Sequence, residues 1–273
     1  MSQVLVVYLI SVYDDRKNLK QFINSYKKYK AGTNHDLLIC FKNFSKNDPI
    51  FDTNELNEVK FIKFLDNHSQ NDYDWHSYSR VAKNYKDKIV FFMNCHSFPI
   101  VDDWLKKFYD NYEKKTLLGP GGSKASMVND ALNGIHSSNK IKSILYAISN
   151  FYDFGFFPNP HIRSNCFMIS AENYLGLKLT ERYMLKKKGT WINESGRNGM
   201  TNQLKRKNFN ILVVNSEGKA FIEKDWNKSN TYAINDQSKL IISDKYSRIY
   251  DNSNETEKLQ ISKQVWGDLN LRS

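Results

Sequence analysis

Four polar or reactive residues follow directly after an apolar run of the chain. Residues 88–93 have the pattern of a buried strand, and Asn94, Cys95, His96 and Ser97 come next. Asparagine and serine are poor primary ligands for a hard cation such as Mg²⁺, whereas an imidazole can bind a softer metal ion. A single histidine without partner ligands is usually not a metal site. We therefore expect no metal ligand among these four residues.

Arg163 and Asn165 stand at the start of a second apolar run, Cys166 to Ile169. A buried arginine needs an anionic partner, which favours a role in a binding site over a role in the core. His161, between Pro160 and Arg163, can also contact a phosphate. This segment is therefore a candidate for binding an anionic ligand.

A glycine turn, Gly119-Pro120-Gly121-Gly122, is followed by Ser123. Glycines let the backbone approach a ligand closely and offer N–H groups to its oxygens. Lone glycine turns are common, and the spacing is not that of a Walker phosphate-binding loop. An ordinary turn is therefore the alternative to a ligand contact at Gly121, Gly122 and Ser123.

These residues follow elements that alternate between strands and helices. We predict strands at residues 4–10, 36–41, 59–65, 88–93, 116–118, 166–169 and 211–214. We predict helices at residues 75–85, 102–112, 141–151 and 201–207. One more helix begins after Asp14 and Asp15 and carries Leu19, Phe22, Ile23 and Tyr26 on one face. This alternation predicts an α/β fold, with a Rossmann-like, mostly parallel central sheet and helices on both faces. Ligands bind beyond the carboxyl ends of such strands, so we expect the site in the loops 11–15, 42–45, 66–74 and 94–99.

The composition excludes several classes of protein. With 273 residues, of which 40% are hydrophobic and 25% charged, the chain is globular and needs no disulfide or metal ion to fold. Its longest apolar stretch, Val4 to Tyr13, is too short for the ~20 residues of a membrane-spanning helix, and we find no secretory signal pattern. Cys40, Cys95 and Cys166 form no disulfide framework or zinc-knuckle pattern, so we expect a reduced, cytoplasmic protein.

The chain carries an excess of positive charge, with 40 Lys and Arg against 29 Asp and Glu and a net charge of +11. Such an excess suits an anionic partner, which can be a nucleic acid, an acidic membrane surface or a phosphorylated small molecule. The basic residues are scattered and no RNP, helix-turn-helix or zinc signature is present, so we expect no nucleic-acid partner. A basic nucleic-acid-binding protein is the less favoured alternative.

The run of residues 88–97, with Pro99 and a helix that opens with Trp104 and Leu105, resembles the glycosyltransferases of the type-A fold (GT-A), which present an Asp-x-Asp motif in this way. More narrowly, it is similar to a bacterial subgroup found with surface-polysaccharide and rhamnan-synthesis enzymes, in which the motif is Asn-x-x-Ser. Further matches follow in the same order over residues 3 to 250, namely the N-terminal strand with its acidic turn and helix, Asp72-Tyr73-Asp74 before Tyr78, Arg80 and Ala82, Gly119 to Ser123, His161 to Met168, Glu194-Ser195-Gly196, Thr201, Trp226 and Ser229. The resemblance implies a GT-A-like fold and transfer of a sugar from a nucleotide-sugar donor to a glycan or lipid-linked glycan in surface polysaccharide synthesis.

The resemblance also implies which residues bind the donor. They are Ser11, Tyr13, Asp72, Arg80, Asn94, His96, Ser97, Gly121, Gly122, Ser123, Arg163 and Asn165. In Asp-x-Asp enzymes a carboxylate binds Mg²⁺ or Mn²⁺, which neutralises the leaving diphosphate. This chain has no carboxylate between Asn94 and Ser97, so we expect little or no metal dependence, with Arg80 and Arg163 on the phosphates instead. An ordinary exposed helix arginine is the alternative for Arg80.

Glu194 is the candidate catalytic base that the resemblance implies. Inverting transfer needs a base to take the proton of the acceptor hydroxyl, usually a Glu or Asp on the acceptor side. The alternative is that Glu194, Ser195 and Asn198 start the helix that contains Leu204. Asp74 and Asp72 are second candidates for the base, or for a contact with uridine or ribose. A retaining mechanism, and a hexose or a pentose as the sugar, stay open.

We expect a single domain over residues 1–273, in which residues 1–123 bind the nucleotide-sugar, 124–224 carry the acceptor side and the base, and 225–273 form a C-terminal extension. The lysines at 27, 28, 30, 106, 107, 114 and 115 either face the anionic inner leaflet of the cytoplasmic membrane, as in a peripheral membrane protein, or face solvent. The aromatic loop of residues 151–158 is either core or a lip that faces sugar or lipid. Because the Asp-x-Asp motif is missing, a catalytically inactive scaffold is an alternative function.

Overall fold

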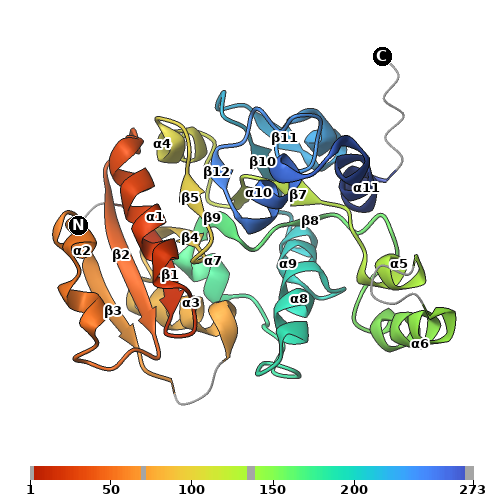
Figure 1. Ribbon diagram of the computed structural model, residues 1–273, viewed down its shortest axis with the longest axis horizontal. Coiled ribbons are helices and arrows are strands. Elements are labelled where there is room, and N and C mark those ends of the chain that lie inside the picture. Colours follow the sequence, from red (N-terminus) through yellow and green to blue (C-terminus); the bar gives the residue numbers. More distant parts are fainter. Residues whose placement is uncertain (1–2, 69–71, 134–138, 268–273) are drawn as a thin grey trace.

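The computed structural model describes residues 3–68, 72–133 and 139–267 of the chain. At its centre is an eight-stranded sheet with the strand order β11-β10-β6-β9-β4-β1-β2-β3 (Figure 1). The strands of the sheet are β1 (Val4–Ser11), β2 (His35–Lys42), β3 (Ile62–Asp66), β4 (Ile89–Met93), β6 (Thr116–Gly119), β9 (Cys166–Ser170), β10 (Asn210–Val214) and β11 (Ala220–Ile222). Strands β3, β2, β1 and β4 run parallel, β9 runs antiparallel between β4 and β6, and β10 is parallel to β6 and antiparallel to the edge strand β11.

The other elements surround this sheet. The helices are α1 (Arg16–Lys28), α2 (Asn54–Asn57), α3 (Tyr73–Asn84), α4 (Trp104–Tyr109), α5 (Met127–Leu132), α6 (Lys140–Phe151), α7 (Ala171–Leu175), α8 (Lys187–Ser195), α9 (Met200–Arg206), α10 (Lys245–Asn252) and α11 (Glu255–Trp266), with 3₁₀ turns η1 (Pro49–Asp52) and η2 (Glu223–Lys228). Two short antiparallel pairs join β5 (Phe98–Pro99) to β12 (Ile242–Ser243) and β7 (Gly122–Ser123) to β8 (His161–Ile162).

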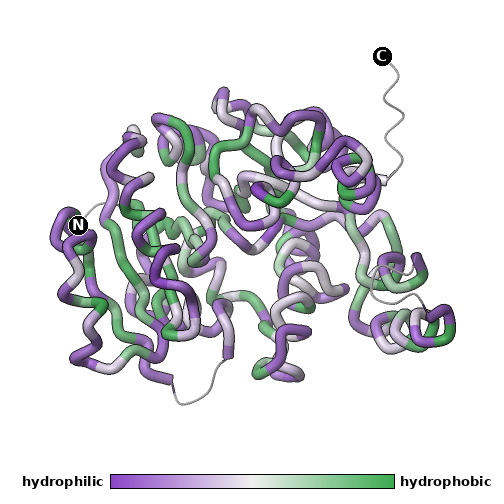
Figure 2. Tube along the Cα trace, in the orientation of Figure 1, coloured by the Kyte–Doolittle hydropathy of each residue, from purple (hydrophilic) through white to green (hydrophobic). Residues whose placement is uncertain are grey.

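Alternate residues of β1 point to opposite faces of the sheet, as successive residues of a strand do. Val6 and Tyr8 pack in a buried cluster with residues of α1 and α4. Val7 and Leu9 pack on the other face with residues of α3, α7 and α9. Figure 2 shows the hydrophobic strands between more hydrophilic helices. The prediction of a mostly parallel α/β sheet with helices on both faces is confirmed. The strand at 166–169 was predicted but not its antiparallel direction, and the edge strand β11 was not predicted.

The start of α1 differs from the expectation in one respect that affects the site. We expected both Asp14 and Asp15 to cap this helix. Only Asp15 does so, because one residue occupies the N-cap position, and its Oδ1 accepts a hydrogen bond from the backbone N–H of Lys17 at 2.9 Å. The Oδ2 of Asp14 instead accepts a hydrogen bond of 2.8 Å from the N–H of Ser11, at the end of β1. The Asp14 side chain therefore does not cap α1 and lies instead among the loops that follow the strands.

Residues 226–267 pack against earlier parts of the chain. The indole of Trp226 is fully buried, and a Cβ on Gly122 would lie 2.6 Å from its Cε3, so a glycine is required at this contact. Strand β12 pairs with β5, and the indole of Trp266 donates a hydrogen bond of 3.1 Å to the carbonyl of Tyr232. The sequence patterns predicted neither α10 nor α11.

Among the described residues, no helix combines the length and the apolar character that crossing a bilayer requires. Cys40, Cys95 and Cys166 are all buried and are free thiols.

Candidate active site

The strand order reverses between β1 and β4, which makes the crevice beyond their carboxyl ends the topological switch point of the sheet. From β1 the chain moves to β2 and β3 on one side and then returns to β4 on the other. Open α/β sheets bind ligands at such a point. The loop that holds Asp14 follows β1, and the loop of residues 94–97 follows β4.

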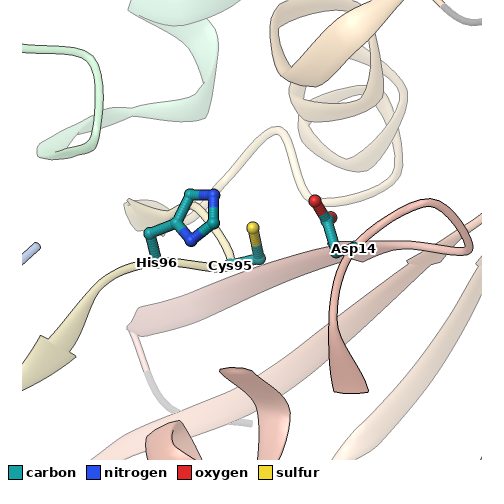
Figure 3. A group of neighbouring side chains, drawn as sticks. All are labelled: Asp14, Cys95 and His96. Carbon is teal, nitrogen blue, oxygen red and sulfur yellow. The ribbon is translucent and has the colours of Figure 1, made fainter. Parts of the chain in front are cut away.

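The carboxylate of Asp14, the thiol of Cys95 and the imidazole of His96 form one cluster at this point (Figure 3). Each offers one possible ligand atom, and these atoms all lie within 4.8 Å of one another. The backbone of the cluster is held by strand β1, because the hydroxyl of Tyr8 donates a hydrogen bond of 2.9 Å to the carbonyl of Cys95. Beside the cluster, Ser11 is buried and Tyr13 is 73% exposed. From the sequence we expected a histidine without partner ligands at position 96, whereas in the structure Asp14 and Cys95 lie beside it.

Burial sets the protonation states of the cluster. It raises the pKa of the Cys95 thiol well above the usual range, and the charges of Asp14 and Asp74 add to this. It lowers the pKa of His96, an effect that Asp14 opposes and that Lys245 and Arg248 reinforce. Burial also raises the pKa of Asp74 to about 6, with a further contribution from Asp14. At neutral pH the thiol is protonated and the imidazole is neutral.

The donor atoms of this cluster decide which metal ion it suits. One carboxylate oxygen, one imidazole nitrogen and one sulfur match a borderline ion such as Zn²⁺, which binds three protein ligands in open sites. Mg²⁺ requires oxygen ligands in an octahedral arrangement, and the cluster offers it a single carboxylate. The cluster formed by Asp14, Cys95 and His96 therefore does not fit Mg²⁺, and it fits a softer ion better.

Asn94 and Ser97 shape the loop after β4. The Oδ1 of Asn94 accepts hydrogen bonds from the N–H of His96 at 3.1 Å and from the Oγ of Ser97 at 2.9 Å. The N–H of Asn94 donates to the carbonyl of Asn165 at 3.0 Å, and Ser97 is fully buried. These contacts hold the loop in the turn that brings the ring of His96 to Cys95.

Arg80 lies in an ion-pair network at the ends of β2 and β3. Its guanidinium donates two hydrogen bonds to Asp66, of 2.5 and 2.7 Å, and two to Asp72, of 2.6 and 3.1 Å. The ammonium of Lys42, which is 1% exposed, also contacts Asp72 and donates 2.9 Å hydrogen bonds to the carbonyl of Tyr73 and to Ser77. Although burial opposes it, hydrogen bonds from Arg80 and Lys42 lower the pKa of Asp72 to about 2. Two cations and two carboxylates therefore neutralise one another here.

Arg163 is buried and faces Asp244, just before α10. Its NH1 and NH2 groups donate to the two carboxylate oxygens of Asp244 at 2.7 and 2.9 Å, and Asn165 Nδ2 donates to Oδ2 of the same group at 3.0 Å. The guanidinium carbon lies 3.5 Å from the ring centroid of Tyr232. From the sequence we expected an anionic partner for a buried Arg163, and this partner is a residue of the chain itself, Asp244.

The residues of the glycine turn are all buried. Gly122 lies against the indole of Trp226, and a Cβ on Gly121 would lie 3.0 Å from the Cβ of Tyr232. Ser123 Oγ accepts a hydrogen bond of 3.0 Å from the N–H of Ala125. Close packing against the C-terminal part of the chain is therefore sufficient to explain the small residues of this turn.

Glu194 lies in the last turn of α8, and its side chain is 22% exposed. The hydroxyl of Ser164 donates a hydrogen bond of 2.5 Å to Oε2, and Nε2 of His161 lies 3.9 Å from Oε1. Gly199 is the N-cap of the next helix, α9, so the alternative that Glu194 starts that helix is wrong. The turn between α8 and α9 separates Glu194 from the start of α9.

Arg248 of α10 is a half-buried cation that the sequence argument did not consider. Its NH1 donates a hydrogen bond of 3.1 Å to the carbonyl of His96 and one of 3.3 Å to Ser243. Among the residues that the structure describes, no carboxylate forms an ion pair with Arg248. Burial lowers its pKa and Asp244 partly offsets this. Together with the exposed Lys245, Arg248 supplies positive charge beside the cluster of Asp14, Cys95 and His96.

Several solved structures show a distant likeness to this chain. The mannosyltransferase Ktr4p from S. cerevisiae is 12% identical over 72% of this chain and 63% of its own length, with a TM-score of 0.38. HddC from Yersinia pseudotuberculosis is 13% identical over 63% of this chain and 79% of its own length, with a TM-score of 0.38. The galactosyltransferase LgtC, solved with donor and acceptor sugar analogues, is 8% identical over 78% of this chain and 73% of its own length, with a TM-score of 0.38. This chain thus spans less than two thirds of the mannosyltransferase. Scans against protein families and against curated proteins find no match.

Proposed function

We propose that this chain is a glycosyltransferase that moves a sugar from a nucleotide-sugar donor to a hydroxyl of a glycan or lipid-linked glycan in surface polysaccharide synthesis, on the cytoplasmic side of the membrane. The collinear motifs of the sequence support this proposal, and so does a cluster of polar groups at the switch point of a mostly parallel sheet. The observation that carries it is the segment of residues 161–165, in which Asn165 contacts the loop after β4 while Ser164 and His161 face Glu194.

The donor diphosphate would lie next to His96, between the switch point and α10. Arg80 and Arg163, our candidates from the sequence, are neutralised by carboxylates of the chain, so we propose that they position this edge of the sheet. Arg248 and Lys245 are better placed to balance the charge of a leaving diphosphate, because neither is ion-paired among the described residues. The exposed ring of Tyr13 is available to stack on the base or sugar.

Glu194 would act as the base of an inverting transfer. The oxygen of the acceptor hydroxyl forms a bond to the anomeric carbon, the bond from that carbon to the diphosphate oxygen breaks with its electron pair, and Glu194 accepts the hydroxyl proton. Because Ser164 donates to Oε2, we assign this proton to the second oxygen, Oε1, which lies 3.9 Å from Nε2 of His161. Asp74, with its pKa raised to about 6, is the second candidate for a proton acceptor.

The donor set of Asp14, Cys95 and His96 does not fit Mg²⁺, so we propose that the reaction depends on fixed cations rather than on this metal ion. The experiment that tests the function is turnover of a panel of UDP- and GDP-sugars to free nucleoside diphosphate, with and without a chelator. Turnover of one donor that survives chelation and is lost in Glu194→Gln supports the proposal. Binding of donors without turnover by the wild-type chain would favour the inactive scaffold instead.

A further inference from the structure

The apolar side of helix α6 faces away from the rest of the protein. Its buried residues are small or polar, namely Ser143, Ala147 and Asn150. Its outward side, which we call the α6 apolar face, consists of residues that are 50–70% exposed: Ile141, Ile144, Leu145, Ile148 and Phe151. A helix of a globular protein normally turns such a stripe toward the core. Figure 1 shows α6 at the end of the molecule away from β3, and Figure 2 shows hydrophobic residues along it.

Aromatic residues extend the α6 apolar face beyond the end of the helix. Tyr152 is 79% exposed and Phe156 52%, and the ring centroids of Phe151 and Phe156 lie 5.3 Å apart. A contiguous exposed apolar area of this kind marks an interaction surface rather than scattered surface residues. Tyrosine, which has an apolar ring and a polar tip, is enriched where a protein meets the lipid headgroups.

The surroundings of the α6 apolar face are cationic. Lys140 and Lys142 are exposed on the helix itself, Lys188 Nζ donates a hydrogen bond of 3.2 Å to the carbonyl of Ser149, and Arg197 Nε donates one of 3.3 Å to that of Phe151. The sequence contains no acidic residue between Asp130 and Asp153. Asp153 is itself ion-paired with Lys188 and Arg182.

We propose that the α6 apolar face docks on an anionic lipid membrane, with the helix parallel to the surface and its lysines among the headgroups. Apolar residues flanked by cations are the pattern of an interfacial helix. A second copy of the chain is a poorer occupant, because a symmetric contact would bring the same cations together. Two of the lysines that we first considered for this role, Lys27 and Lys106, are less suitable, since Lys27 is paired with Glu58 and Lys106 with Asp110.

The inner side of α6 connects this face to the proposed site. Ala147 packs in a buried cluster with Phe154 and with Ile192 of α8, and Phe154 forms a β-bridge with Gly196. Glu194 lies between Ile192 and Gly196 on the same segment. Docking through α6 would thus bring the base near the membrane, where a lipid-linked acceptor resides. Only this last consequence rests on the proposed function.

The test is flotation of the full chain with vesicles made of equal parts phosphatidylglycerol and phosphatidylcholine. We expect the wild-type chain to float and the double variant Ile144→Ser/Ile148→Ser to lose at least about tenfold in partitioning. Leu259→Ser, which changes a residue of α11 that is 51% exposed, is the matched control and should float like the wild type. Lys140→Glu/Lys142→Glu, and vesicles of phosphatidylcholine alone, should each weaken binding.

Three results would overturn the proposal. The wild-type chain fails to float, the Ile144→Ser/Ile148→Ser variant floats as well as the wild type, or light scattering shows a dimer that this variant converts to a monomer. Because the variant replaces exposed residues, its melting temperature should match that of the wild type. Donor binding in solution, measured separately, distinguishes a failure of membrane docking from a failure of the proposed function.

Discussion

The hydroxyl oxygen of Ser164 lies 2.5 Å from Oε2 of Glu194. A serine hydroxyl that donates to one carboxylate oxygen fixes the orientation of the whole group, and the other oxygen, Oε1, lies 3.9 Å from Nε2 of His161. Because Ser164 lies between Arg163 and Asn165, the same short segment positions both the base and the residues that pair with Asp244. Residues 163–165 therefore link the proposed base, Glu194, to the ion pair of Arg163 and Asp244.

Replacement of Glu194 by Gln should abolish sugar transfer and leave donor binding intact. The amide keeps the shape of the side chain but cannot accept the acceptor proton, so we expect turnover to fall at least about hundredfold. Donor affinity, measured by calorimetry, should stay within about twofold, because a general base acts in the proton-transfer step and not in donor binding. Glu172→Gln, at an exposed position of α7, is the control. Turnover at the wild-type rate in Glu194→Gln would assign the base elsewhere, with Asp74 next in line.

Removal of the Arg163 side chain should destabilise the fold as well as weaken donor binding. Arg163→Ala leaves the carboxylate of Asp244 buried without its cation, and breaking a buried pair in this way costs about 3–5 kcal/mol. Arg16→Ala, which breaks the exposed pair with Asp48, should cost no more than about 1 kcal/mol. The free energy of unfolding in urea measures both. If Arg163→Ala is as stable as Arg16→Ala, Arg163 does not hold Asp244 in solution.

The cluster of Asp14, Cys95 and His96 should bind a borderline divalent ion such as Zn²⁺ or Co²⁺ and should not bind Mg²⁺. Co²⁺ is the spectroscopic probe, because coordination by the Cys95 sulfur produces a sulfur-to-metal charge-transfer band in the near ultraviolet. We expect this band in the wild-type chain, its loss in Cys95→Ser and its persistence in Cys40→Ser, where the thiol lies buried in the core. Absence of the band in the wild-type chain, or an equal band in Cys95→Ser, would refute a metal site with this donor set.

Asp74 should make stability decrease as the pH rises from about 4 to about 6. Its pKa in the folded protein is about 6, above the usual value, because it is buried and near Asp14; Asp72 raises it too, and Lys42 opposes them. The folded state therefore binds the proton more tightly than the unfolded state, and the stability that this provides is lost as the pH rises through the folded pKa. Buried histidines act in the opposite sense, so the comparison must be with Asp74→Asn.

The measurement for Asp74 is the urea midpoint of both chains over this pH range. Stability relative to Asp74→Asn should fall for the wild type between about pH 4 and about pH 6 and then level off. A difference between the two chains that does not change with pH would show that Asp74 ionises normally.

Local sequence patterns were sufficient for every strand of the sheet except the edge strand β11, but not for the contacts between distant segments. The continuous apolar run of β1 and the cap at Asp15 predicted their elements to within a residue or two, since both depend on neighbours in the chain. The partner of Arg163, by contrast, lies 81 positions further along. Nothing in the local pattern of Asp244 distinguishes it from the other aspartates, because pairing at this distance depends on the whole fold.

Two signals in the sequence were nevertheless visible and not used. Asn254 and Glu257 have the spacing of a capping box, and both of its hydrogen bonds are present at the start of α11. The pair Asp14-Asp15 offers two capping side chains to one helix, so that one of them had to be left over. Since the loops after β1 and β4 were both expected at the same edge of the sheet, Asp14 could have been predicted near His96.

The central claim is that a nucleotide-sugar binds at the switch point between β1 and β4, and calorimetric titration with UDP- and GDP-sugars tests it most directly. We predict binding of one donor that is unchanged by a chelator, about tenfold weaker in Arg248→Ala, and normal in Arg182→Ala, where the guanidinium is exposed. Absence of binding by every nucleotide and nucleotide-sugar in the panel would contradict the claim.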